Sequence, residues 1–130
     1  MVQIGNEELI GIAKSVVKPK RISREVSTGT IGCALVTGKG NVYTGVCIDA
    51  SCGIGFCAEH SAIASMVTNG EFKIRKIVAV SQSGKIFPPC GRCRELMCQI
   101  SGDALGIEII VGKNKVLKLK ELLPSPWQKV

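Results

Sequence analysis

Aromatic residues are scarce in this sequence: Phe, Trp and Tyr together make up 4% of it, with one Trp and one Tyr. Proteins that bind single-stranded nucleic acids generally stack bases on aromatic side chains, so this scarcity argues against such a partner. The formal net charge of +7 would otherwise point to nucleic acid. Because the basic residues form no single dense block, we interpret them as a solvated surface. A negatively charged small substrate remains compatible with this charge.

Long apolar runs are also missing. No segment approaches the ~18 consecutive apolar residues of a membrane-spanning helix, and no stretch has the features of a signal peptide. Internal repeats, linkers and low-complexity segments are absent too. The 130 residues, of which 45% are hydrophobic, therefore predict one domain over residues 1–130 with its own core and no membrane partner.

Cysteine, in contrast, is plentiful, with seven residues. An odd number grouped in short motifs suits a metal site better than a disulfide framework, so we expect a reducing, cytoplasmic setting. Cys57, Cys90 and Cys93 lie at the starts of two expected helices, where the positive end of the helix dipole favours a thiolate. Cys90 and Cys93 are three residues apart, so one helical turn lets both bind one ion. Three thiolates leave the fourth position of a tetrahedral zinc ion open, as in a catalytic site, and we predict one Zn²⁺ per chain.

Glu59 follows Cys57 by two residues on the same expected helix. It begins an apolar stripe spaced i, i+3, i+4, i+7 and i+8, whose other members are Ala62, Ile63, Met66 and Val67. A carboxylate on that stripe points inward, and burial raises its pKa. Such a group suits the transfer of protons for a water molecule beside the metal. We therefore predict that Glu59 is the catalytic residue.

A second interpretation of the same residues stays open. A Cys-x-x-Cys pair at the start of a helix is also typical of thiol–disulfide oxidoreductases, with Cys90 and Cys93 as the redox pair. A redox dithiol has no need of Glu59, which favours the metal site. We interpret the remaining cysteines mostly as small core residues. They are Cys33, Cys47, Cys52 and Cys98.

The apolar patterning predicts helices over residues 7–17, 58–67 and 92–100 and strands over 30–37, 42–48, 74–80 and 107–111. A short final helix is expected within residues 117–122. The order helix-strand-strand-helix-strand-helix-strand predicts an α/β fold, a three-layer sandwich in which helices flank a mixed β-sheet.

Three segments resemble the small, homotetrameric cytidine deaminases, and especially their blasticidin-S deaminase branch. The segments are Gly55-Phe56-Cys57-Ala58-Glu59-His60, Pro89-Cys90-Gly91-Arg92-Cys93-Arg94-Glu95-Leu96 and Glu121-Leu122-Leu123-Pro124-Ser125. The first two carry the pattern typical of zinc deaminases. The resemblance extends from the first expected helix to Trp127. It implies the cytidine deaminase-like fold, a homotetramer, and hydrolytic deamination of a free cytosine-containing small molecule to a uracil-type product and ammonia.

The resemblance also implies roles for single residues. The three thiols match the zinc ligands, and Glu59 matches the proton shuttle. The backbone of Ala58 matches a donor to the pyrimidine carbonyl oxygen. Arg94 matches an arginine that hydrogen-bonds ligand sulfurs. Trp127 lies where related tetramers have an aromatic residue that reaches toward a neighbouring subunit's active site.

Several positions depart from the family pattern. His60 stands where many cytidine deaminases have an arginine, although it can still donate to a ligand sulfur. Cys47 and Asp49 replace the Asn and Glu of an Asn-x-Glu motif that grips the ribose hydroxyls, and residues 26–29 replace a Tyr-Ser-x-Phe-type segment. We therefore expect Cys47 and Asp49 to bind substrate in an altered way, with cytidine a poor substrate. Cytidine, deoxycytidine and blasticidin S all stay open, as does a deaminase-like protein that binds a pyrimidine without catalysis.

Overall fold

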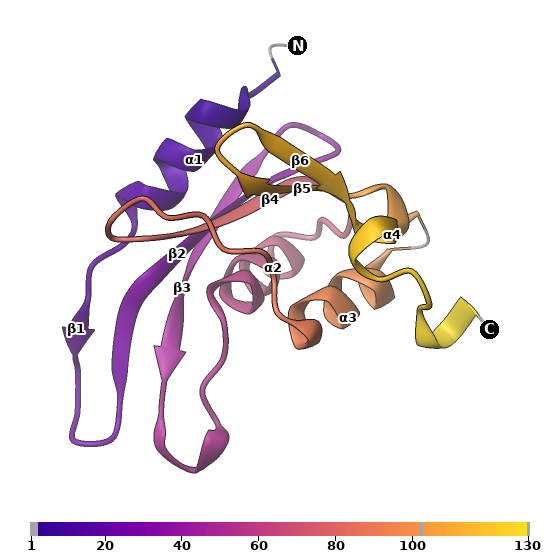
Figure 1. Cartoon of the computed structure of the whole chain (residues 1–130). Coiled ribbons are helices and arrows are strands. Elements are labelled where there is room, and N and C mark those ends of the chain that lie inside the picture. The colour runs from indigo at the N-terminus through magenta and orange to yellow at the C-terminus, as the bar shows by residue number, and fades with distance from the viewer. Residues whose placement is uncertain (1–2, 102, 130) are drawn as a thin grey trace.

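The computed structural model describes residues 3–101 and 103–129 (Figure 1). Its helices are α1 (Asn6–Ser15), α2 (Ala58–Thr68), α3 (Gly91–Ile100) and α4 (Leu119–Leu122). Its strands are β1 (Lys20–Arg21), β2 (Ser27–Thr37), β3 (Val42–Asp49), β4 (Ile74–Ser81), β5 (Glu108–Gly112) and β6 (Lys115–Lys118). Short 3-10 turns are η1 (Ser51–Gly53), η2 (Ala104–Gly106) and η3 (Trp127–Lys129).

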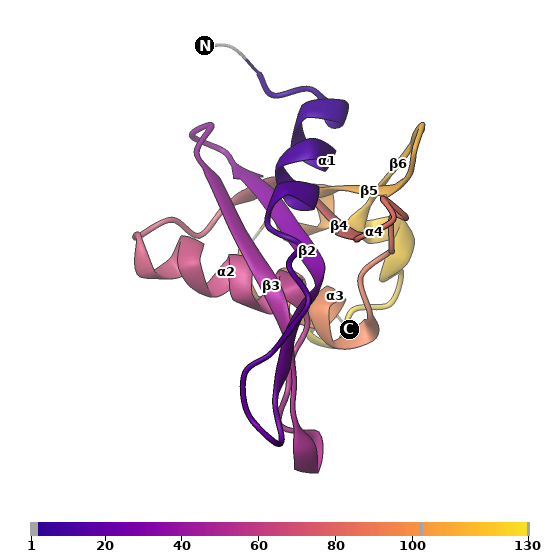
Figure 2. The ribbon, with the colours of Figure 1, turned by 90° about the vertical axis from the view of Figure 1, so that its left-hand side faces the viewer.

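The strands form one six-stranded mixed sheet. β2 pairs antiparallel with both β3 and β4, while its first residues also pair with β1. β4 and β5 are parallel, and β5 returns antiparallel through β6. α1 lies on one face of the sheet, and α2 and α3 lie on the other (Figures 1 and 2). The expected mixed sheet flanked by helices is therefore confirmed.

The core is divided in two by the sheet, because successive residues of a strand point to opposite faces. In β2, Cys33 and Leu35 pack toward α2 and α3, whereas Ala34 and Val36 pack toward α1. β4 repeats this alternation from Ile77 to Val80. Burial on both faces explains why these strands read as nearly continuous apolar runs.

Helix α2 is held close to β3 at a position where β3 has no side chain. A Cβ on Gly45 would overlap the backbone nitrogen of Ala62 and the side chain of Ser61. The Ser61 hydroxyl donates to the Val46 carbonyl at 2.7 Å. This contact fixes the height of α2 above the sheet and hence the position of the residues at its N-terminus.

Two short strands were not expected from the sequence. β6 occupies the first part of the region where a helix was expected, so the helix begins only at Leu119. Pairing of Val116 and Leu117 with β5 across a tight turn overrides the local preference. β1 is two exposed residues long and has no apolar pattern to reveal it. None of the helices in the described ranges has the length and apolar character needed to cross a membrane.

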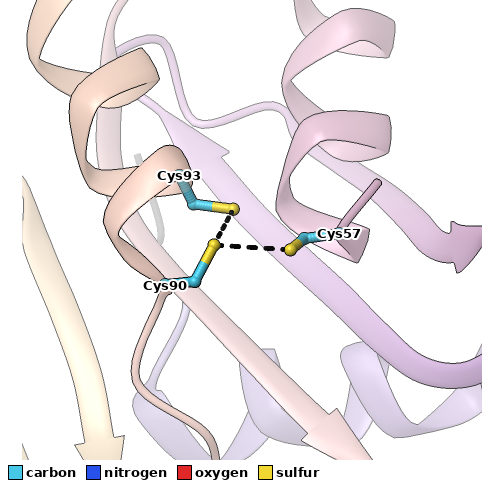
Figure 3. A group of neighbouring side chains, drawn as sticks. All are labelled: Cys57, Cys90 and Cys93. Atoms are coloured by element: carbon cyan, nitrogen blue, oxygen red, sulfur yellow. Dashed lines mark hydrogen bonds between the residues drawn. The ribbon is translucent and has the colours of Figure 1, made fainter. Parts of the chain in front are cut away.

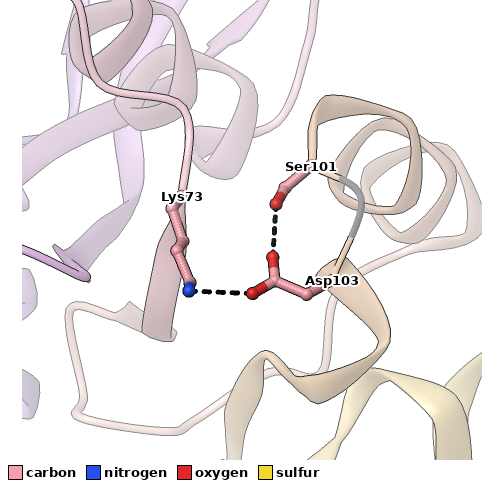
Figure 4. Close-up of polar contacts among 3 residues, drawn as sticks. All are labelled: Lys73, Ser101 and Asp103. Carbon is pink, nitrogen blue, oxygen red and sulfur yellow. Dashed lines mark hydrogen bonds and ion pairs between the residues drawn. The ribbon is translucent and has the colours of Figure 1, made fainter.

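An ion pair lies on the side of the molecule where α2 and α3 end (Figure 4). Lys73 Nζ is 2.8 Å from Asp103 Oδ2, and the Ser101 hydroxyl donates to Asp103 Oδ1 at 2.6 Å. Hydrogen bonds from Lys73 and Ser101, together with the charge of Lys73, lower the pKa of Asp103 to about 2. Because both side chains are exposed, we expect this pair to contribute little to the free energy of unfolding.

Candidate metal centre and pocket

The three thiols expected to bind metal lie together between the starts of α2 and α3 (Figure 3). Cys57 occupies the N-cap position of α2, and Cys90 occupies that of α3. The Cys90 sulfur lies 3.5 Å from those of Cys57 and Cys93. In a tetrahedral site with Zn–S bonds of ~2.3 Å, sulfurs are about 3.8 Å apart. The cluster therefore fits a zinc ion in both ligand type and spacing.

The thiols differ in how readily they ionise. Burial, followed by the hydrogen bond with Cys90, raises the pKa of Cys57 to about 11. Burial and the charge of Glu59 raise the pKa of Cys93 well above its ordinary value. Burial also acts to raise the pKa of Cys90, but the backbone N–H groups of Cys93 and Arg92 and the neighbouring thiols lower it overall. A divalent cation at the centre would stabilise all three thiolates.

Glu59 lies on the first turn of α2, with its side chain 6% exposed. Burial raises its pKa, partly opposed by a hydrogen bond from the backbone. The inward orientation expected from the apolar stripe is thus observed. Glu59 lines the same pocket as Cys57 and Cys90, so the carboxylate faces the space beside the thiols.

This pocket has a volume of about 500 Å³. We call the part lined by Glu59, Cys57, Ala58 and Cys90 its base. The rest of the lining, which we call its walls, consists of Ile31, Ala79, Phe56, Phe87, Pro88, Gly55, Thr30, Cys47 and Asp49. Ala58, Cys47 and Asp49 are thus brought together with the thiols, as the sequence suggested. Trp127 does not line the pocket of its own chain and is 74% exposed.

Sequence reasoning did not assign a site role to several of the lining residues, among them Phe87, Thr30 and Phe56. Phe87 is placed by its N–H, which donates to the Ala79 carbonyl at 3.0 Å, beside the Val80–Ile86 bridge. Its position directly before Pro88 and Pro89 was a usable signal. Thr30 and Phe56 had no such signal, because their orientation depends on how β2 and β3 pair.

The wall that carries Asp49 is tied directly to the segment that carries Cys57. Ile48 and Phe56 exchange backbone hydrogen bonds, both of 2.9 Å, in an isolated antiparallel bridge. A Cβ on Gly55 would overlap the Ile48 carbonyl oxygen, so only glycine allows this close approach. These contacts therefore fix the position of Cys57 relative to the end of β3.

His60 lies beside the thiols. Its Nδ1 is 3.3 Å from the Cys93 sulfur. Burial and the charge of Arg92 lower its pKa, which favours the neutral imidazole. A neutral His60 orients Cys93 without adding charge at the position where an arginine was expected.

Arg94 makes different contacts from those the resemblance implied. Its Nε donates to the Pro89 carbonyl at 2.8 Å, and its Nη1 donates to the Leu122 carbonyl at 2.9 Å. Among the hydrogen bonds of the described residues, none joins Arg94 to a ligand sulfur. Arg94 instead connects the segment before Cys90 to the Leu-Leu-Pro segment near the C-terminus.

The remaining cysteines divide into two groups. Cys33, Cys47 and Cys98 are buried, as expected for small core residues. The expectation was wrong for Cys52, which is exposed in η1 with φ of 63°. The turn lies beyond the end of β3, away from the helices that cover the sheet (Figure 1), so its side chain has no core to enter.

Comparison with known proteins extends over most of the chain. The sequence profile of the cytidine and deoxycytidylate deaminase zinc-binding region matches residues 6–107. The chain belongs to this deaminase family. The match includes all three thiols and Glu59, and it confirms the resemblance noted in the sequence.

Individual relatives agree with this assignment. A blasticidin-S deaminase from Bacillus cereus is 34% identical over 106 residues, which cover 75% of this chain and 76% of the relative. A cytidine deaminase from Mycoplasma genitalium is 32% identical over 114 residues, 85% and 87% of the two chains. The crystal structure of cytidine deaminase from Mycobacterium leprae superposes with a TM-score of 0.80 at 25% identity, covering 95% and 100%.

Proposed function

We propose that this protein is a zinc-dependent hydrolytic deaminase of a free cytosine-containing small molecule, giving a uracil-type product and ammonia. The observation that carries the proposal is that two thiols of a three-thiol cluster with zinc-like spacing, Cys57 and Cys90, line one pocket with the buried carboxylate of Glu59. Family membership supports the reaction type. A thiol–disulfide oxidoreductase, in contrast, does not need a buried carboxylate such as Glu59 beside its cysteines.

Cys57, Cys90 and Cys93 would hold a zinc ion, which would lower the pKa of a water molecule and so supply a hydroxide nucleophile at neutral pH. Glu59 would accept the proton that this water loses and deliver it to the ring nitrogen, while the hydroxide oxygen bonds to the amine-bearing ring carbon. Glu59 would then take the proton of the new hydroxyl group and pass it to the amino nitrogen, so that the C–N bond breaks and ammonia departs. Its raised pKa suits both roles, because the group must accept and release protons in one turnover.

The backbone N–H of Ala58 orients the ring. Ala58 is the first residue of α2, so its N–H has no partner within the helix. Because Ala58 lines the pocket beside Glu59, we propose that this N–H donates to the pyrimidine carbonyl oxygen. The apolar walls formed by Ile31 and Phe87 would enclose the ring and exclude water.

The pocket supports a nucleoside-like substrate rather than a nucleotide. Its lining residues, within the described ranges, include the carboxylates of Glu59 and Asp49 but no Lys or Arg. A phosphate group would find no complementary charge there. Relatives include a blasticidin-S deaminase and cytidine deaminases, and Cys47 and Asp49 lead us to propose that cytidine is the poorer substrate.

We propose that the protein is a cytoplasmic homotetramer of single-domain chains. Trp127 supports this assembly, because η3 holds a large aromatic side chain in solvent. The Gln128 amide donates to the Cys98 carbonyl at 3.2 Å and so anchors the turn to α3. A neighbouring subunit's pocket is the proposed place for this indole.

The test is an ammonia-release screen of zinc-loaded protein with cytidine, deoxycytidine and blasticidin S, together with measurement of the metal content. We expect about one zinc per chain and turnover of at least one compound. A metal-free protein with a reversible Cys90–Cys93 disulfide would favour the redox alternative. A protein that binds zinc and pyrimidines but releases no ammonia would instead be a non-catalytic binding protein.

A further inference from the structure

The pairing of β2 with β3 is interrupted beside the pocket. Thr28 lies opposite Ile48 and Gly32 lies opposite Val46, so residues 29–31 of β2 face Cys47 alone. Gly29 has φ of 85°, and a Cβ there would overlap the carbonyl oxygen of Lys18. Bulges of this kind change the direction in which a side chain points. Here the bulge brings Thr30 to the pocket wall.

The Cys47 sulfur fills the bulge and holds Thr30 in place. Cys47 is 7% exposed, and its sulfur lies 3.2 Å from Thr30 Oγ1. The sulfur also accepts a hydrogen bond from the Ile31 N–H at 3.4 Å, and its S–H donates to Asp49 Oδ2 at 4.0 Å. Either atom of the Thr30–Cys47 contact can be the donor, and in both cases the contact holds the Thr30 hydroxyl at the pocket wall.

This arrangement decides which groups the wall offers to a ligand. Whichever atom donates in the contact with Cys47, the Thr30 oxygen keeps a lone pair that can accept a hydrogen bond from a ligand. The Asp49 carboxylate is an acceptor as well. Both residues line the same pocket as Glu59. The wall therefore complements a ligand group that donates hydrogen bonds.

We infer that Thr30 is a specificity-determining residue, which acts with Asp49 to bind the hydrogen-bond donors on the substrate's ring substituent. The inference rests on the proposed function, because it assumes that the pyrimidine ring lies against Glu59. The donors are hydroxyl or ammonium groups. Cys47 acts as a positioning residue, since it reaches the substrate only through Thr30 and Asp49.

The test compares ligands that differ only in the substituent. Binding of uridine, 3′-amino-3′-deoxyuridine and 1-methyluracil to the zinc-loaded protein is measured by calorimetry, and ammonia release is measured with the matching cytosine compounds. The variants are Thr30→Val, which removes the hydroxyl and keeps the shape, and Thr30→Ser, which keeps the hydroxyl. Thr68→Val is the matched control, because the one hydrogen bond of the Thr68 hydroxyl within residues 3–101 and 103–129 goes to the Ala64 carbonyl on the exposed side of α2.

We expect Thr30→Val to weaken binding of at least one sugar-bearing ligand roughly 2- to 12-fold, the loss of one hydrogen bond, with 1-methyluracil unchanged. Thr30→Ser and Thr68→Val should match the wild type. A larger loss with the amino sugar would identify ammonium as the preferred donor, and a larger loss with uridine would identify hydroxyl. Equal loss for 1-methyluracil, no loss for any ligand, or equal loss in Thr30→Ser would overturn the inference.

Asp49→Asn provides a second test if Thr30→Val does not fold. Asp49 is exposed at the end of β3, so this substitution should leave the fold intact. It should weaken the sugar-bearing ligands and leave 1-methyluracil unchanged, and an unchanged affinity for all three would also overturn the inference. Binding without ammonia release in the wild type would reject the proposed function alone.

Discussion

The base and the rim of the pocket are built in different ways. The base is made from two helix N-termini, which bring Cys57, Glu59 and Cys90 together. The rim is made from a β-bulge and a strand end, which carry Thr30 and Asp49. Helix geometry sets the spacing of ligands at a helix N-terminus. The positions of Thr30 and Asp49, in contrast, depend on pairing between residues that are far apart in the sequence. We therefore expect substitutions at the base to abolish turnover and substitutions at the rim to change which substrate is preferred.

The largest effect is expected when a metal ligand at the base is removed. Cys90→Ala should lose zinc and essentially all turnover, and it should lower the stability of the protein, because metal binding is coupled to folding. Metal content and thermal unfolding give the measurement. Cys52→Ser is the control, since Cys52 is an exposed cysteine outside the cluster. A Cys90→Ala protein that retains zinc and activity would place the metal elsewhere.

The next largest effect is expected for Glu59→Gln, which tests the base without removing the metal. The amide keeps the shape of the side chain but cannot accept a proton. Turnover should fall on the order of 10²–10⁴-fold, while zinc content and the unfolding temperature stay near those of the wild type. Glu95→Gln on α3 is the control, because that carboxylate bonds only to Gln99 among the described residues. Near-normal ammonia release would mean that Glu59 is structural.

At the rim, Cys47→Asn together with Asp49→Glu should raise cytidine turnover. The pair restores an amide and a longer carboxylate at the positions expected to grip the ribose. Two hydrogen bonds of roughly 0.5–1.5 kcal/mol each correspond to between about 5- and 150-fold in kcat/KM. Zinc content should not change. Efficient cytidine deamination by the wild-type protein, with no gain in the double variant, would mean that the ribose is bound elsewhere than at residues 47 and 49.

The difference between local motifs and long-range pairing also explains which parts of the site could be predicted from the sequence. The zinc motifs and the stripe of Glu59 are local patterns, so the spacing of Cys57, Cys90 and Cys93 predicted their convergence. Thr30 escaped notice because its direction depends on Cys47, which is 17 residues away. Likewise β6 is defined by its pairing with β5 rather than by its own residues. The resemblance implied that Arg94 hydrogen-bonds ligand sulfurs, but its long side chain donates to the carbonyls of Pro89 and Leu122.

The smallest effect is expected for Trp127→Ala, which asks whether the rim is completed by another subunit. Trp127 is 74% exposed in one chain, and burial of part of the indole against a neighbour's pocket would contribute about 1 kcal/mol, roughly 5-fold in KM. Zinc content and kcat should remain close to wild type, because the side chain does not touch the thiols.

The control is Phe72→Ala, an aromatic residue that is 55% exposed and does not line the pocket with Glu59. Light scattering after size-exclusion chromatography gives the assembly state of each variant. A wild-type tetramer in which Trp127→Ala alone raises KM supports a shared pocket. A wild-type monomer, or an equal effect of Phe72→Ala, would show that each chain completes its rim with residues such as Thr30 and Asp49 alone.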